Sequence, residues 1–279
     1  MRIDVMKTYK LYINGAFPRS ESGRVYEVKD SKGKFLANPC LASRKDLRDS
    51  VVAARAAQAG WSKATAYNRG QILYRVAEIM EGRREQFAAE IVAMEGATPK
   101  AALAQVAAAI DTWVWYAGWT DKISAVAGST NPVAGPFYNF TTPEAIGVVA
   151  VFADSKPSLL GLVSAIAPVI ASGNTAVVLA SEKFPLGAIT LSEALATSDL
   201  PAGVINILTG KSSELASWAA SHMDIDAIDA TGLSKKLEVE ARIAGAQNLK
   251  RIHSFSEIKS ASRILAFMEN KTVWHPIGV

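Results

Sequence analysis

The sequence predicts an α/β fold with a five-stranded parallel sheet flanked by helices. Five short apolar runs in the second half of the chain have the length and composition of buried strands. Each run except the last is followed by a segment with helical periodicity, and strands that alternate with helices in this way form parallel sheets. The runs are Ile146–Phe152, Thr175–Ala180, Gly203–Leu208, Ile225–Asp229 and Asn248–His253.

The region before these strands begins with a hairpin signal. Tyr9–Phe17 alternates in character around Asn14-Gly15, a dipeptide that two-residue hairpin turns prefer. Such a turn needs a second extended segment nearby. We expect Val25–Val28 to be the partner strand.

Helical spacing of apolar residues fills most of the region up to residue 119. Ser43 is an N-cap residue for the first helix, which we expect to end near Gly60 because glycine disfavours helix interiors. The next apolar pattern, closed by Gly96 and Pro99, predicts one long amphipathic helix or two abutting helices. The expected helical segments are Arg44–Gln58, Asn68–Met94 and Lys100–Trp119.

Two segments outside the alternating region are expected to form a protruding hairpin and a C-terminal strand. Ser124–Pro143 is rich in Gly, Pro and Ser, and its Phe137–Phe140 stretch has strand character. Near the end of the chain, Ala261–Glu269 is expected to be a short helix and Lys271–Trp274 a strand.

The composition indicates a globular protein without a strong charge bias. Hydrophobic residues make up 49% and charged residues 20%, and the net charge of +4 is scattered, so we expect no nucleic-acid partner. The opening MRIDVMKTYK lacks the apolar core of a secretory signal. The longest apolar run, Leu159–Ala171, falls short of the ~20 residues of a membrane span. One cysteine, Cys40, fits a reducing compartment, so we expect a cytoplasmic protein without membrane contact.

A series of short motifs runs through the chain from about residue 10 to residue 255. The motifs are YINGAF, GWSKATAYNRGQILYRVAEIM, YAGWTDKI, PEAIGVV, IASGNTAVVLASE, LPAGVINILTG, SHMDIDAIDATG and NLKRI. In this order they resemble the NAD-dependent aldehyde dehydrogenase superfamily, and such dispersed agreement is more specific than a lone glycine-rich loop. The resemblance implies that the predicted sheet belongs to a Rossmann-like NAD-binding domain.

After NLKRI the chain departs from the family pattern. The family continues into a catalytic domain that carries its nucleophilic cysteine, whereas this chain goes almost directly to ASRILAFMENKTVW, which resembles the family's closing segment. The resemblance is closest to the non-catalytic second half of two-part aldehyde dehydrogenases, and it implies that the catalytic domain is absent. We expect residues 1–123 and 143–260 to form the NAD-binding domain, and residues 124–142 and 261–279 an oligomerisation hairpin and tail.

The groups with which the family oxidises aldehydes are replaced or missing. Cys40 lies in the wrong part of the pattern to be the nucleophilic thiolate, and a structural role is the favoured interpretation. The oxyanion-stabilising Asn of the family aligns with Lys156. Phe255 stands where the general-base Glu is expected. We therefore predict no catalytic residue and no metal site.

A new polar site at the strand ends is an alternative. Asp154, Lys156 and His253 could form it, because ligands of α/β folds bind at the carboxyl ends of strands. A solvated loop is the favoured interpretation for Asp154 and Lys156. For His253, a single histidine near a strand end, a structural role is favoured.

The cofactor contacts of the family are partly kept. Glu182 matches a ribose-binding glutamate, but the family's lysine before it is Leu179, which donates no hydrogen bond. Thr231 and Gly232 match the pyrophosphate turn at a helix N-terminus, but the serine that follows is Leu233. Glu182, Thr231 and Gly232 are therefore predicted as vestigial cofactor-binding residues. We expect no cofactor, with NAD or NADP as the alternative.

The sequence keeps the glycines and core positions of the family fold, but the family's catalytic groups are replaced or missing. This pattern predicts a catalytically inactive subunit that acts in assembly. The expected partner is a second copy or a full-length aldehyde dehydrogenase. The contacts are expected at Ser124–Pro143 and Lys271–Trp274, because exposed strand edges invite pairing and the resemblance implies association through these elements. The alternatives are an NAD(P)-linked aldehyde oxidoreductase subunit and a nucleotide-binding regulator.

Overall fold

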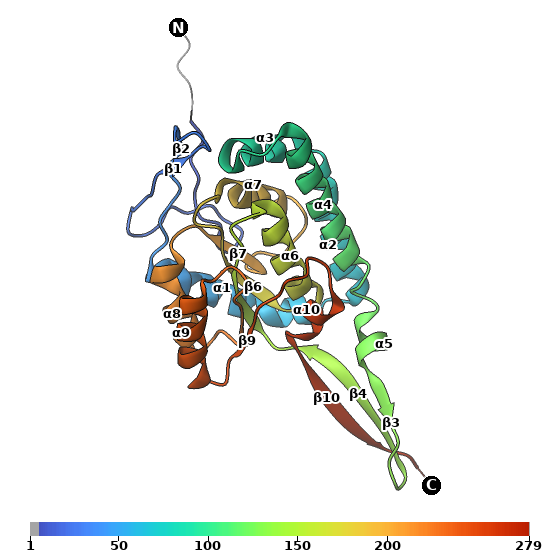
Figure 1. Cartoon of the computed structure of the whole chain (residues 1–279). Helices are drawn as coiled ribbons and strands as arrows, with labels where there is room; N and C mark the ends of the chain where they lie inside the picture. Colours follow the sequence, from blue (N-terminus) through green and yellow to red (C-terminus); the bar gives the residue numbers. More distant parts are fainter. Residues whose placement is uncertain (1–5, 279) are drawn as a thin grey trace.

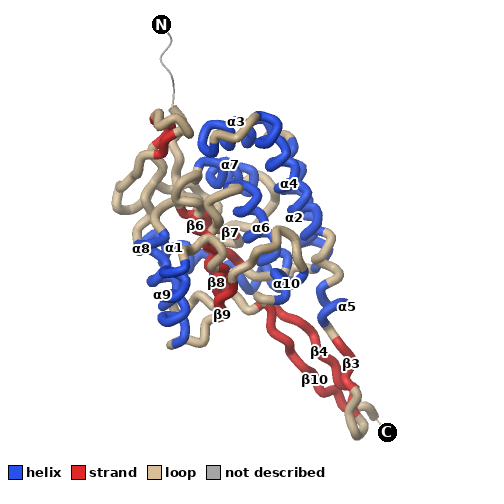
Figure 2. The backbone as a smooth tube through the Cα atoms, viewed as in Figure 1, coloured by secondary structure: helices blue, strands red, loops and turns tan. Residues whose placement is uncertain are grey.

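The computed structural model describes residues 6–278 (Figure 1). A central sheet is covered by helices on both faces, and a long three-stranded sheet projects from this body, with the C-terminus near its tip (Figures 1 and 2). The predicted α/β fold with a five-stranded parallel sheet is confirmed. Residues 1–5 and 279 lie outside the described residues. The expected domain ranges include these residues, and the expected lack of a secretory signal concerns residues 1–5, so these parts of the two expectations also lie outside the described residues.

The central sheet has the strand order β7-β6-β5-β8-β9, and all four pairs are parallel. The chain moves outward from β5 through β6 to β7, and then returns to the other side of β5 for β8 and β9. Each of the five predicted runs contains one strand. The strands are β5 (Val148–Phe152), β6 (Thr175–Leu179), β7 (Ile205–Leu208), β8 (Ala227–Asp229) and β9 (Arg251–His253).

Successive strand residues supply two separate hydrophobic cores, because their side chains point to opposite faces of the sheet. In β5, Val149 and Val151 belong to the first core, whereas Val148, Ala150 and Phe152 belong to the second. The first core is packed by α2 (Ala66–Glu81), α3 (Arg84–Glu95), α4 (Pro99–Ala117), α6 (Ser158–Ala171) and α7 (Leu186–Leu195), and the second by α1 (Arg44–Lys63), α8 (Ser212–Ser221) and α9 (Lys235–Ala246).

The predicted helices before the sheet are present, with boundaries set by tertiary contacts. α1 begins after Ser43, whose side chain caps it as predicted. The expected end near Gly60 is wrong, because Trp61 is buried and donates from Nε1 to the Ile170 carbonyl at 2.9 Å, which holds the last turn in place. The sequence left open whether residues 68–94 form one helix or two, and the structure has two, α2 and α3.

The turn at Asn14-Gly15 is present, but the partner strand expected for it is wrong. Asn14 and Gly15 have φ angles of 51° and 75°, as a two-residue hairpin turn requires. Tyr12 pairs instead with Ile207 of β7, with backbone hydrogen bonds of 2.9 and 2.7 Å. Because β7 is an edge strand, the backbone groups of Ile207 would otherwise be unpaired, and Tyr12 satisfies them. The Val25–Val28 segment contributes to β1 (Val28–Lys29), which pairs with β2 (Phe35–Ala37).

The predicted hairpin and terminal strand form one antiparallel sheet of order β10-β4-β3, which is the projecting sheet (Figure 2). A short helix, α5 (Ile123–Ala127), leads into β3 (Ser129–Asn131), and β4 (Phe137–Ala145) returns to the body. β10 (Met268–Pro276) pairs with β4 along its full nine residues.

Two details of this region differ from the expectations or extend them. The predicted helix Ala261–Glu269 ends early, as α10 (Ala261–Leu265), because β10 begins its pairing with β4 at Met268. β4 runs through positions 142 and 143, where the domain boundary was expected. The proposed division into domains stays a prediction.

Asn174, next to the first residue of β6, joins the body to the root of the projecting sheet. Its side chain is fully buried, its Oδ1 accepts a hydrogen bond from Gly147 N at 2.7 Å, and its Nδ2 donates to the Phe267 carbonyl at 2.7 Å. Gly147 connects β4 to β5, and Phe267 connects α10 to β10. One amide thus fixes both strands that leave the body.

Asn174→Ala is expected to lower the free energy of unfolding by about 3 kcal/mol, because it leaves the buried Gly147 N–H without an acceptor and removes a donor from Phe267. Urea denaturation measures this change. Asn68→Ala, at an exposed position of α2, is the control and is expected to change stability by less than ~0.5 kcal/mol. Equal effects of the two substitutions would contradict the role given to Asn174.

Candidate functional site

The carboxyl ends of β5 and β8 meet where the strand order reverses, which is where open α/β sheets bind ligands. Val151 of β5 pairs with Asp229 of β8, and Asp229 pairs with His253 of β9. The ends of three strands therefore lie side by side. The groups in and after these strand ends define the candidate site.

Thr231 and Gly232, two of the predicted cofactor-binding residues, have polar groups that the protein itself occupies. Thr231 Oγ1 donates to Asp229 Oδ1 and accepts a hydrogen bond from Phe255 N at 3.1 Å. Gly232 N donates to the Phe152 carbonyl at 2.9 Å, and a Cβ at Gly232 would lie 2.1 Å from a backbone oxygen after β5. The turn after β8 packs directly against the end of β5, and glycine is required for this close approach.

A buried ion pair adjoins this turn. Arg263 of α10 donates from Nη2 to Asp229 Oδ2 at 3.0 Å, and the two side chains are 3% and 0% exposed. Arg263 also donates to the Glu257 carbonyl at 2.8 Å and lies over the ring of Phe255, 4.7 Å from its centroid. Sequence reasoning missed this pair, because residues 34 positions apart without a shared motif give no local signal.

Residues 254–267 close the first-core face of the sheet at β8 and β9. The ring of His253 lies 6.0 Å from that of Phe255 and 5.8 Å from that of Phe267, which is fully buried. α10 also packs against α6. Within the described chain, β9 is thus followed by a short segment and α10 that pack onto the core.

The ends of β6 and β8 are largely apolar. Leu179 and Leu233 are 5% and 9% exposed and belong to the second core together with Phe152. Glu182 is exposed, and its carboxylate makes no hydrogen bond or ion pair with any residue between 6 and 278. Burial raises the pKa of Tyr26 above its usual range, and the charge of Glu182 adds to this shift.

Asp154, Lys156 and His253 do not form one polar cluster. Lys156 Nζ donates to the Glu95 carbonyl at 3.2 Å, and Asp154 Oδ1 accepts from the neighbouring backbone N–H at 2.6 Å. His253 packs among aromatic rings, and burial is the main cause that lowers its pKa. In the described structure no hydrogen bond joins His253 to either of the other two residues.

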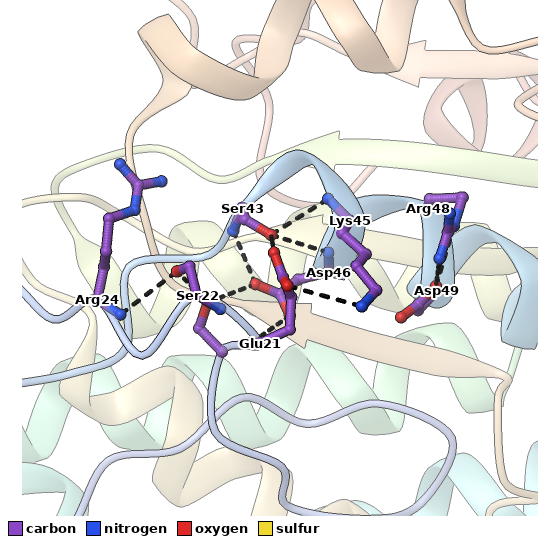
Figure 3. Close-up of polar contacts among 9 residues, drawn as sticks. Glu21, Ser22, Arg24, Ser43, Lys45, Asp46, Arg48 and Asp49 are labelled. Atoms are coloured by element: carbon purple, nitrogen blue, oxygen red, sulfur yellow. Dashed lines mark hydrogen bonds and ion pairs between the residues drawn. The ribbon is translucent and has the colours of Figure 1, made fainter.

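A polar network holds the N-terminal segment against the start of α1 (Figure 3). Ser43 N donates to Asp46 Oδ2 at 2.7 Å, and Ser43 Oγ donates to Glu21 Oε1 at 2.9 Å. Just before this network, Cys40 is 4% exposed in the second core, and Thr209 Oγ1 donates to its carbonyl at 2.6 Å. Cys40 therefore has the environment of a buried core residue.

Between residues 6 and 278, no group of three or more His, Cys, Asp or Glu side chains could hold a metal ion. None of the helices in the same range combines the length and apolar character needed to cross a bilayer.

The parallel sheet, its switch point and the glycine turn after β8 define a Rossmann-like α/β scaffold. Comparison with protein families matches residues 17–272 to the Aldehyde dehydrogenase family. The chain belongs to this family, as the resemblance of its motifs predicted.

Curated relatives and solved structures show how much of the family architecture is present. Human retinal dehydrogenase 2 is 34% identical over 253 residues, which are 88% of this chain and 48% of the relative. The cytosolic 10-formyltetrahydrofolate dehydrogenase of Xenopus tropicalis is 33% identical over 269 residues, 94% of this chain and 29% of the relative. An NAD+ complex of a Bacillus cereus aldehyde dehydrogenase has a TM-score of 0.83 and 27% identity, and the match covers 88% of this chain and 50% of that one. The chain thus spans about half the length, or less, of these relatives.

Two observations bear on whether this chain binds a cofactor. Because a protein of the same fold was solved as an NAD+ complex, the comparisons give no support to the expectation that no cofactor is used. The residues of this chain nevertheless fit a dinucleotide poorly. The Thr231 hydroxyl and the Gly232 N–H are already engaged, and Leu179 and Leu233 offer no hydrogen bonds.

Arg263→Met is expected to lower the free energy of unfolding by about 3–5 kcal/mol, because it leaves the Asp229 carboxylate buried without a partner. Adding Asp229→Asn should recover part of this loss. Arg75→Met is the control, since Arg75 pairs with Glu78 in solvent and should cost less than ~1 kcal/mol. Urea denaturation measures all three variants, and an Arg263 effect as small as that at Arg75 would contradict a buried pair.

Proposed function

We propose that this chain is a catalytically inactive aldehyde dehydrogenase family subunit that acts in assembly through the projecting sheet. The free edge of β10 carries the proposal. β10 lies at one side of the order β10-β4-β3, and its residues from Asn270 to Pro276 are all exposed. An exposed strand edge of this length offers backbone donors and acceptors to a strand of another chain.

The two faces of the projecting sheet support an interface. Phe137 packs edge-on against Trp274 with ring centroids 5.7 Å apart, and Tyr138 lies 5.4 Å from Phe140 on the next pleat. Trp274 is 57% exposed and Tyr138 is 47% exposed. Each face therefore carries an aromatic pair with an exposed member, and exposed aromatic residues are typical of protein–protein contacts.

The strand ends support the absence of catalysis. Phe255, at the position expected for the general base, contributes its ring to the packing over Arg263. Cys40 is buried in the second core, so its thiol does not reach a substrate without opening the fold. The carboxyl edge of the parallel sheet, where a family enzyme would hold its reactants, makes internal contacts in this chain.

The partner in this proposal is a second copy of the chain or a full-length aldehyde dehydrogenase, in the cytoplasm. β10 pairs with β4 along one edge, and its start contacts α10 and Arg251 of β9. Its residues from Asn270 to Pro276 stay exposed, which leaves the outer edge of this part available. A relative that carries the matching strand can pair there in the same way as a second copy.

The double substitution Val273→Lys and Trp274→Lys is expected to convert the assembly to monomers, because lysines on an edge strand oppose pairing. Native mass spectrometry of the chain alone and with a full-length homologue measures the assembly. Trp218→Lys, at a 43% exposed tryptophan of α8, is the matched control and should leave the mass unchanged. A wild-type chain that is monomeric in both samples would refute the proposal.

Nucleotide binding, as a regulator or as an NAD(P)-linked oxidoreductase subunit, is the second candidate function. The free carboxylate of Glu182 and the NAD+ complex of the Bacillus cereus relative favour it. We expect calorimetric titration with millimolar NAD, NADP, ADP or AMP to give no binding heat, since the groups after β8 are already bonded. Binding heat that Glu182→Gln abolishes would favour the second function over the first.

A further inference from the structure

Arg44, at the start of α1, is an exposed cation that an aromatic ring holds in one orientation. Its guanidinium lies over the indole of Trp218 in α8, 3.3 Å from the ring centroid. This contact uses the flat face of the guanidinium, whereas the N–H donors of an arginine lie in the plane of the group. No hydrogen bond or ion pair of the Arg44 side chain occurs within residues 6–278. Within that range its N–H groups are therefore oriented by the indole and open to a ligand.

Arg44 and Trp218 line a cavity of about 690 Å³ between the start of α1 and the end of α8. This volume lies within the range of small-molecule sites. Arg44 is exposed, Trp218 is 43% exposed, and Leu47 adds an apolar group to the wall. A ligand in the cavity can therefore reach both the cation and the ring.

The charges on the cavity wall favour an anion. The wall carries the cations Arg44, Lys45 and Arg48 and the carboxylate of Glu21. Glu21 pairs with Lys45 at 3.6 Å, and Arg48 pairs with the neighbouring Asp49 at 2.9 Å (Figure 3). Arg44 has no carboxylate partner in the part of the chain that the structure describes. The wall therefore keeps a positive charge that a ligand can balance.

Two further titratable groups near the cavity do not compete for Arg44. Asp46 is 4% exposed, and its carboxylate accepts hydrogen bonds from Ser20 Oγ and Ser43 N, both at 2.7 Å. His222, on the wall, has its pKa lowered mainly by burial, so it is neutral at pH 7. Its Nδ1 accepts a hydrogen bond from Asp224 N at 3.2 Å.

We propose that this cavity binds a small oxyanion, a phosphate or a carboxylate, on the exposed N–H edge of Arg44. Two parallel N–H donors of a guanidinium match two oxygens of one oxyanion, and a monatomic anion does not offer that match. Because Trp218 already orients the guanidinium, binding costs little further side-chain entropy. Lys45 and Arg48 add positive charge on the same wall. This site does not depend on the proposed assembly.

Thermal unfolding of the full chain in inorganic phosphate, acetate or chloride at equal ionic strength tests the site. Phosphate or acetate at about 20 mM should raise the Tm by about 2 °C or more above chloride, and the more effective ion identifies the oxyanion class. Arg44→Gln should abolish this difference between salts. Arg75→Gln is the matched control, because Arg75 pairs with Glu78 on α2, and it should keep the wild-type difference.

A second variant tests the part of the ring. Trp218→Leu keeps the charge of Arg44 and removes the indole that orients it, so the Kd of the more effective ion should rise roughly threefold or more. Isothermal titration calorimetry measures this Kd. Equal Tm values of the wild type in all three salts, an undiminished oxyanion effect in Arg44→Gln, or an unchanged Kd in Trp218→Leu would overturn the proposal.

Discussion

The buried ion pair between Asp229 and Arg263 is the contact on which the second half of the structure depends. It holds α10 against the end of β8, and residues 254–267 then cover the sheet face at β8 and β9. From there the chain reaches Phe267, whose carbonyl is bound by Asn174, and continues as β10. A charge pair in the interior is stabilising only when its remaining polar groups are also satisfied. Thr231 donates two hydrogen bonds to Asp229 Oδ1, and the Glu257 carbonyl accepts one from Arg263, whose Nε has no acceptor among the described residues.

The same contacts occupy the ends of β5, β8 and β9 in this family scaffold with internal hydrogen bonds and packing. The region where an open α/β sheet binds its ligand is occupied by Thr231, Gly232 and Phe255 bonding to one another and to the strands. These bonds give a closed core at β9. They also fix the root of the projecting sheet, which extends away from the body with β10 at its edge (Figure 1). One set of contacts therefore closes the core at β9 and fixes the root of the projecting sheet.

The strands and most helices could be predicted from the sequence because apolar periodicity is a local property. The errors arose where distant segments decide the outcome. Tyr12 pairs with Ile207 because β7 has a free edge, and α1 passes Gly60 because Trp61 reaches the Ile170 carbonyl. At the site, the resemblance placed Thr231 and Gly232 in the turn after β8, which the structure confirms. It gave no sign that their polar groups are occupied or that Arg263 lies beside them, since both depend on packing across the chain.

Native-state hydrogen exchange of the intact chain tests most directly whether residues 254–267 are part of the closed core. The account predicts that the amides of Ala266, at the C-terminal end of α10, and Ile252 in β9 exchange only through the opening that also exposes Val149 in β5, with similar protection factors. Rapid exchange of α10 at the rate of a frayed surface helix, while β5 stays protected, would show that the segment is not an integral part of the core and would contradict the account.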